Sequence, residues 1–276
     1  MSDHTLLRQK TVLYKLLDSM TPSYSACIIP VFVQTSDSPP EFRGTGSACL
    51  ITYGERYFFV SAFHVFNDDR TDGLLFTIIN DRSVPLNDLA AVKWNEYDLI
   101  IAELSEEWLI KNEVSKTSFL PVEVDENWVA TPVFTLAGYP ATQKNLLQLQ
   151  KERTISNRTL VSFTAYPHPE KVEVKNAKLT IAFTHDPKTM TNSDGLRIGG
   201  CPPPPGMSGG AALQLAMNHS EPPKVNMGLL FAGILCSWIR EKKAIAAIPA
   251  DVVIGFIEKQ FFSNSAPEIA VGSTHR

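Results

Sequence analysis

The chain has 276 residues, of which 44% are hydrophobic and 20% charged, and its formal net charge is −4. This balance is typical of a globular protein with a sizeable core and argues against intrinsic disorder. The slightly acidic charge predicts no nucleic-acid-binding surface, and no apolar run approaches the roughly 18 residues that a membrane-spanning helix needs. We therefore expect neither a nucleic acid nor a membrane as a partner.

Residues 5–19 predict an amphipathic helix, and we assign residues 1–26 to an N-terminal helical segment. Apolar residues recur at helical spacing, at Leu6, Leu7, Val12, Leu13, Leu16 and Leu17. This spacing is typical of a helix that packs on the body of a protein. We expect the helix to end at Thr21 and Pro22. A helix lying on a membrane surface is the alternative, but it would need a more basic face.

A first set of strands follows the helix. The β-branched and aromatic residues 27–34 predict a strand, and residues 44–51 and 56–62 predict a hairpin that turns at Gly54. Residues 74–79 and 98–104 predict two further strands. Together they delimit a first β-rich unit of residues 27–105, and the more acidic residues 106–127 are interpreted as a connector.

A second set of strands and a final helix complete the chain. The predicted strands are residues 131–136, 159–164, 177–183, 211–215, 229–236 and 244–248, within a second unit of residues 128–249. Residues 251–260 place Val252, Val253, Phe256 and Ile257 on one face and predict a C-terminal helix, within a closing segment of residues 250–276. The sequence thus predicts an all-β fold with a helix at each end.

The four cysteines, Cys27, Cys49, Cys201 and Cys236, are few for this length. The N-terminus lacks the continuous apolar segment of a signal peptide, so we expect reduced thiols and a cytoplasmic protein. A Cys201–Cys236 disulfide is the alternative. No pair has the CxxC spacing of a zinc or redox site, and no metal or cofactor is predicted.

One serine stands out because glycines flank it. Ser208 lies in the sequence Gly206-Met207-Ser208-Gly209-Gly210, after a run of four prolines. Glycines allow backbone conformations that are closed to other residues, and they let another segment approach closely. A nucleophilic serine needs both, because its hydroxyl must be exposed and nearby N–H groups must point at one spot. A Pro/Gly-rich turn with a passive serine is the simpler interpretation of this window alone.

A serine hydroxyl is inert near neutral pH unless a base takes its proton and a third group orients that base. His64 ends an apolar run and Asp98 opens another, so the chain order is His, Asp, Ser. The other downstream histidines, His168, His185 and His219, follow Asp98 and fit this order less well. Asp81 and Asp88 are the competing acids.

With these three signals in order, the sequence resembles the trypsin-like (chymotrypsin-fold) serine peptidases over roughly residues 27–260. It is most similar to bacterial-type members with a single protease domain and without the features of a secreted zymogen. The resemblance implies two antiparallel six-stranded β-barrels, residues 27–105 and 128–249, with the active site in the cleft between them.

The resemblance also implies the role of each residue in a serine endopeptidase that processes a specific intracellular protein through an acyl-enzyme intermediate. Ser208 would attack the scissile carbonyl, with His64 Nε2 within hydrogen-bonding reach of Ser208 Oγ. His64 would act as general base and then general acid, and Asp98 would orient its ring. The N–H groups of Gly206 and Ser208 would form the oxyanion hole.

The resemblance further implies a substrate pocket and a mode of control. Pro202 would lie at the base of the pocket, and the strand that lines it would contain Ile234, Leu235, Cys236, Ser237 and Trp238. Without an acid at position 202, we expect a small or apolar residue before the cut. Met207 stands where many secreted relatives have an aspartate that activation by cleavage requires. We therefore expect a weak free enzyme, a mobile loop at residues 199–206 and an activating protein partner.

Two other functions compete with this interpretation. The same folds and residues could present a peptide-binding groove in a protease-like module that does not cut. The glycine-flanked serine also fits the Gly-x-Ser-x-Gly motif of α/β-hydrolases, which would make the protein an esterase. That fold orders its triad Ser, Asp, His, and only Asp251 with His275 follows Ser208.

Overall fold

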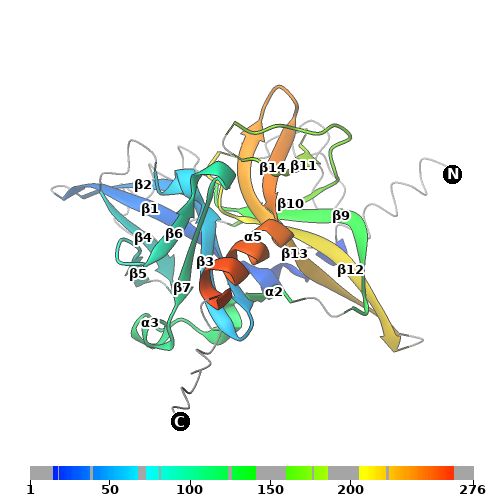
Figure 1. The fold of residues 1–276 in the computed structure, drawn as a ribbon, viewed down its shortest axis with the longest axis horizontal. Helices are drawn as coiled ribbons and strands as arrows, with labels where there is room; N and C mark the ends of the chain where they lie inside the picture. Colours follow the sequence, from blue (N-terminus) through cyan, green and yellow to red (C-terminus); the bar gives the residue numbers. More distant parts are fainter. Residues whose placement is uncertain are drawn as a thin grey trace, which may run out of the picture.

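The computed structural model describes residues 15–17, 19–37, 40–67, 73–80, 82–123, 126–140, 160–175, 177–185, 205–221 and 224–263. In this part, the chain forms two mainly antiparallel sheets with short helices around them (Figure 1). The all-β class predicted from the sequence is therefore confirmed. A search of the described residues finds no helix that is both long and apolar enough to span a membrane.

The first sheet contains eight strands, against the six expected. In chain order they are β1 (Ile28–Asp37), β2 (Pro40–Tyr53), β3 (Arg56–Ala62), β4 (Leu74–Ile79), β5 (Arg82–Pro85), β6 (Ala91–Trp94), β7 (Leu99–Leu104) and β8 (Leu120–Pro121). Their spatial order is β5-β4-β1-β2-β3-β7-β6, and β8 pairs with β2 in parallel. The predicted hairpin is β2–β3, and its turn residues Gly54 and Glu55 have φ of 54° and 62°.

The second sheet contains six strands in the described residues. They are β9 (Trp128–Gly138), β10 (Val161–Ala165), β11 (Ile181–Thr184), β12 (Ala211–Glu221), β13 (Lys224–Ile239) and β14 (Ala244–Pro249). Their spatial order is β10-β9-β12-β13-β14-β11. Every predicted strand overlaps one of these. Only the end of the predicted strand at residues 177–183 belongs to β11, because Ala177 forms an isolated bridge with Val174 and residues 178–179 form a bend.

The N-terminal helix stops before Thr21, as the sequence predicted, but a second short helix follows it directly. Residues 15–17 and 19 are helical, and α2 (Thr21–Ser25) follows, with Pro22 in its first turn. A proline is tolerated there because the first N–H groups of a helix have no partner within the helix. The expected start of the helix, residues 5–14, lies outside the described residues.

The other helices are short. The predicted connector contains α3 (Glu106–Lys111) and the 3₁₀ turn η3 (Lys116–Ser118), and the side chain of Ser105 caps α3 by accepting from the N–H of Trp108. Two more 3₁₀ turns, η1 (Phe63–Val65) and η2 (Asn95–Tyr97), lie beside the strands of the first sheet. The predicted C-terminal helix is α5 (Ala250–Ile257), which continues as the π-helical turn η4 (Glu258–Phe262).

One hydrophobic core joins the two sheets. Its buried members include Val60 of β3, Leu99 of β7, Ile234 of β13 and Ile248 of β14. Val253 of α5 belongs to the same core and is fully buried, and α5 lies in front of the junction between the sheets in Figure 1. Because the core is shared, loops from the two sheets are held at fixed positions relative to one another. The candidate site lies at this junction.

Candidate active site

His64 and Asp98 are brought together by the pairing of β3 with β7. The two strands are antiparallel, and Ala62 at the end of β3 lies opposite Leu99 at the start of β7. The residues just after β3 and just before β7 must therefore meet. The N–H of Phe63 donates to the carbonyl oxygen of Asp98 at 2.8 Å, which fixes this junction.

The Asp98 carboxylate holds His64 with both oxygens. Asp98 Oδ1 accepts from the backbone N–H of His64 at 2.9 Å, and Oδ2 lies 2.7 Å from His64 Nδ1. Asp98 is only 5% exposed, whereas 46% of the His64 side chain is exposed. Since an ionised carboxylate can only accept, the proton of a neutral ring lies on Nδ1. His64 Nε2 is then left free to accept a proton from a group in the cleft.

The backbone of Asp98 makes this double contact achievable. Asp98 ends η2 in the left-handed region, with φ 53° and ψ 41°. Few non-glycine residues occupy this region, and aspartate is among those that tolerate it best. A less usual backbone at this position is consistent with a functional constraint.

The competing residues lie elsewhere. The ring of His168 is partly buried, with Nδ1 lying 3.1 Å from Glu170 O and Nε2 lying 3.1 Å from Lys242 O. His185 is buried and packs against the rings of Phe163 and Trp238. Asp88 is exposed. Asp81 lies outside the described residues. For His219 only the backbone, which belongs to a strand, is described.

Ser208 lies in a tight turn that connects to both sheets. Gly206 and Gly209 have φ of 94° and 85°, so both occupy backbone conformations that favour glycine. The N–H of Gly209 donates to Leu235 O of β13 at 2.6 Å. From the first sheet, the N–H of Ser47 donates to the carbonyl oxygen of Ser208 at 2.7 Å. The nucleophile candidate is therefore held from both sides.

Ser47 is a site residue that the sequence did not reveal. Its hydroxyl donates to Gly206 O at 3.1 Å and accepts from the N–H of Tyr139 at 2.8 Å. The hydroxyl of Ser61 in turn donates to Ser47 O at 2.7 Å. These contacts fix the peptide next to Ser208. The Gly-x-Gly-Ser sequence that ends at Ser47 is the only local pattern that could have indicated this role. The partners of the Ser47 hydroxyl, Tyr139 and Gly206, are more than ninety residues away in the chain.

The Ser208 hydroxyl is directed at β13. It donates to the carbonyl oxygen of Cys236 at 3.4 Å. Over the described residues, no hydrogen bond joins it to the His64 ring, so the expected contact with Nε2 is not made in this conformation. A rotation about one side-chain bond would redirect the hydroxyl.

The N–H groups predicted to form an oxyanion hole have no acceptor among the described residues. The neighbouring N–H groups of Gly209 and Gly210 are both used, by Leu235 O and Met207 O. Those of Gly206 and Ser208 donate to no described group. They are therefore available to an oxygen atom of a ligand.

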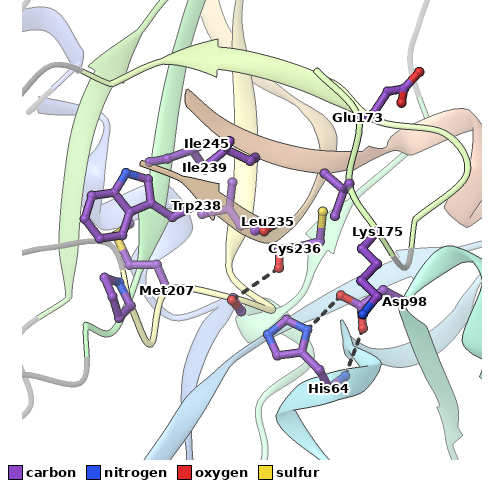
Figure 2. A pocket seen from close by; sticks show the side chains of 14 residues that line it. His64, Asp98, Glu173, Lys175, Met207, Leu235, Cys236, Trp238, Ile239 and Ile245 are labelled. Atoms are coloured by element: carbon purple, nitrogen blue, oxygen red, sulfur yellow. Dashed lines mark hydrogen bonds and ion pairs between the residues drawn. The ribbon is translucent and has the colours of Figure 1, made fainter. Parts of the chain in front are cut away.

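All three residues of the predicted triad line one cleft of about 430 Å³. Figure 2 shows His64 and Asp98 on one side and Met207, Leu235 and Trp238 on the other. Of the predicted pocket residues, Leu235, Cys236, Ser237 and Trp238 line this cleft. Ile234 does not, because its side chain is fully buried in the core. Pro202 and the loop from 199 to 204 lie outside the described residues.

The structure adds lining residues that were not predicted for the substrate pocket. Apolar Met207, Ile239 and Ile245 extend the wall formed by Leu235 and Trp238. A separate loop contributes its residues from the opposite side, namely Glu173, Val174 and Lys175. This loop is distant in sequence from every motif, so nothing placed it at the site beforehand.

The thiol of Cys236 is buried beneath the site. Burial raises its pKa well above the ordinary value, and the nearby Asp98 carboxylate raises it further. The thiol donates to Ala246 O at 3.5 Å and is unoxidised. Cys27 and Cys49 are also free and buried. Because its thiolate is strongly disfavoured, Cys236 contributes an uncharged, poorly nucleophilic group to the cleft.

The described residues contain no cluster of three His, Cys, Asp or Glu side chains that could bind a metal ion. No family model matches the chain. No curated protein matches it either.

The chain is similar to several solved structures. One of them is described in the words "Aromatic interactions drive the coupled folding and binding of the intrinsically disordered Sesbania mosaic virus VPg protein". Sequence identity to it is 12%, the match covers 86% of this chain and 95% of that chain, and the TM-score is 0.44. A likeness at this TM-score and identity assigns no function to this chain.

Proposed function

We propose that this chain is a serine endopeptidase that cleaves a protein or peptide substrate. The observation that carries the proposal is the 2.7 Å contact between His64 Nδ1 and Asp98 Oδ2 in the cleft that Ser208 also lines. A histidine that is oriented by a buried carboxylate and shares a cleft with a serine can activate the serine hydroxyl.

In the proposed acylation step, each group of the cleft has a defined role. Ser208 Oγ attacks the scissile carbonyl carbon while His64 Nε2 takes the hydroxyl proton. Asp98 stabilises the imidazolium, and the free N–H groups of Gly206 and Ser208 stabilise the oxyanion. Removing one such donor costs roughly 3 kcal/mol of transition-state stabilisation in serine proteases. His64 then protonates the leaving amine, and water hydrolyses the acyl-enzyme by the reverse proton path.

The proposal includes a trypsin-like architecture. The six antiparallel strands of the second sheet, the antiparallel pairing in the first, and the site between them all support two β-barrels. The order β10-β9-β12-β13-β14-β11 is an open path in the described residues, so closure of each barrel belongs to the proposal. The closing helix α5 and the tight turn at Ser208 support the same family.

The substrate is proposed to place an apolar side chain in the cleft. Met207, Leu235, Trp238, Ile239 and Ile245 form its apolar wall. Burying an aliphatic side chain there is worth about 1.5–3 kcal/mol, which suits recognition of the residue before the cut. A protein partner that turns the Ser208 hydroxyl away from Cys236 O would activate the free enzyme.

A second candidate function is a peptide-binding module that does not cut. The hydrogen bond from the Ser208 hydroxyl to Cys236 O favours it, because this serine is not engaged with its base. An esterase of the α/β-hydrolase type finds less support. That motif requires a helix after the serine, whereas β12 follows Ser208.

Labelling by an alkyl fluorophosphonate probe tests the catalytic proposal. The probe reacts with a serine whose hydroxyl is activated and forms a stable adduct. We expect one adduct on the parent protein, located at Ser208 by peptide mass spectrometry, and none on Ser208→Ala or His64→Ala. A parent protein that stays unlabelled over hours while folded would favour the binding module. An adduct at another serine would contradict the assignment.

A further inference from the structure

A loop between β10 and β11 borders the cleft. Glu173, Val174 and Lys175 from this loop line it. The loop has its own anchors, since Val172 and Ala177 are buried and the Thr180 hydroxyl donates to Val172 O at 3.1 Å. The position of the loop beside the site is therefore fixed by buried side chains and a hydrogen bond within the loop.

The loop is also fixed to the first sheet, next to the catalytic acid. The N–H of Lys178 donates to Glu96 O at 3.0 Å, and the Lys178 ammonium forms an ion pair with the Glu96 carboxylate. Glu96 belongs to η2, which ends at Asp98. This attachment holds the loop over the end of the cleft that contains His64 and Asp98. In Figure 2, the Lys175 side chain extends from the loop in the direction of Asp98, while Glu173 points away.

Lys175 supplies an unpaired positive charge at this end of the cleft. Its side chain is exposed, and it forms no ion pair or hydrogen bond with any described residue. The Asp98 oxygens are already held by the ring and the backbone N–H of His64. By contrast, the ammonium of Lys178 is paired with Glu96. Glu173 of the same loop is also exposed and lines the cleft, so its carboxylate can compete with an acidic ligand for Lys175.

The opposite wall is apolar, so the cleft has two chemically different sides. Successive side chains of an extended peptide point in opposite directions. If the residue before the cut, P1, faces the wall of Met207 and Trp238, then its neighbour P2 faces His64 and the loop. The group that P2 meets there is the Lys175 ammonium.

We propose that Lys175 is a specificity residue that selects an acidic side chain at P2. The inference rests on the proposed peptidase function and names its substrate class: peptides with an apolar P1 and an aspartate or glutamate at P2. Exposed ion pairs are weak, so the expected preference for Glu over Gln at P2 is about two- to fivefold in kcat/KM. A P2 lysine should be disfavoured by a similar factor.

Fluorogenic peptides with one apolar P1 residue and Glu, Gln or Lys at P2 test this inference. The enzymes compared are the parent, Lys175→Glu and Lys171→Glu. Lys171 is also exposed and lies in the same loop, but it does not line the cleft, so its variant is a control with the same net charge. Fluorophosphonate labelling of Ser208 is measured on all three proteins.

We expect Lys175→Glu to reverse the preference between Glu and Lys at P2, whereas Lys171→Glu should be labelled and should select P2 like the parent. A Glu173→Gln variant should strengthen the preference for Glu, because it removes the competing carboxylate. If the parent is labelled and cleaves all three peptides equally, or if Lys171→Glu shifts the preference as much as Lys175→Glu, the inference about Lys175 is overturned and the peptidase proposal stands. Absence of labelling in the parent would overturn the peptidase proposal and this inference with it.

Discussion

At the scale of single residues, the candidate triad could be predicted because its signals are local. His64 follows a strand, Asp98 precedes one and Ser208 lies among glycines, and each pattern is visible within a few positions. The left-handed backbone of Asp98 and the bond from Ser208 to Cys236 O are not local properties. They depend on how β3, β7 and β13 pack, so no window of sequence contains them.

The buried cysteines make a further residue-scale prediction, on stability. Burial raises the pKa of Cys27 to about 11 from the ordinary 9.0 and also raises that of Cys49. Between pH 9 and 11 the unfolded chain releases these protons and the folded chain keeps them. The free energy of unfolding therefore falls as the pH rises through this window. Each unit of pKa difference corresponds to about 1.4 kcal/mol.

Urea unfolding at pH 8 and pH 10.5 measures this effect. Cys27→Ala should lose about 1 to 2 kcal/mol less than the parent between these two pH values. Comparing the change with pH, rather than the stability itself, separates ionisation from the cavity that the substitution leaves. An equal loss in the two proteins would show that the Cys27 thiol ionises normally in the folded state.

At the scale of elements, strands with a clear pattern were predicted and short strands were not. The β2–β3 hairpin was predicted from its turn at Gly54, and β4 coincides with the predicted residues 74–79. The strands β5 and β6 have four residues each, too few for alternation to be distinguished from a loop. The two-residue β8 exists only because it pairs with β2, so it was interpreted as connector.

The turn at Ser208 gives the element-scale prediction. A Cβ atom at Gly209 would overlap Ser47 O and Ser61 Oγ, and φ of 85° disfavours any side chain. Gly209→Ala should lower the free energy of unfolding by more than about 2 kcal/mol and abolish labelling of Ser208.

The matched control for that variant is Gly255→Ala. A Cβ at Gly255, in α5, would meet nothing within 4 Å. This change should raise stability by roughly 0.5–1 kcal/mol, because alanine favours a helix over glycine. Thermal unfolding of both variants, with the labelling assay, checks the pair. A Gly209→Ala protein that is as stable and as reactive as the parent would contradict the close packing of this turn against Ser47.

At the scale of the whole molecule, the site exists only where the two sheets meet. His64 and Asp98 come from the first half of the chain, Ser208 and its neighbours from the second, and a shared core fixes the two halves. The sequence predicted two groups of strands, because strand patterns cluster in two parts of the chain. It did not predict the apolar wall at Ile239 and Ile245 or the loop at Lys175, because these residues meet the triad through tertiary packing alone.

The central claim is that the cleft hydrolyses peptide bonds through Ser208. The most direct measurement is mass-spectrometric detection of new N-termini in a library of peptides of varied sequence, after incubation with the parent protein or with Ser208→Ala. We predict that the parent produces new termini after apolar residues and that Ser208→Ala produces none. If the folded parent binds peptides but generates no new termini, or if Ser208→Ala generates the same ones, the claim is contradicted.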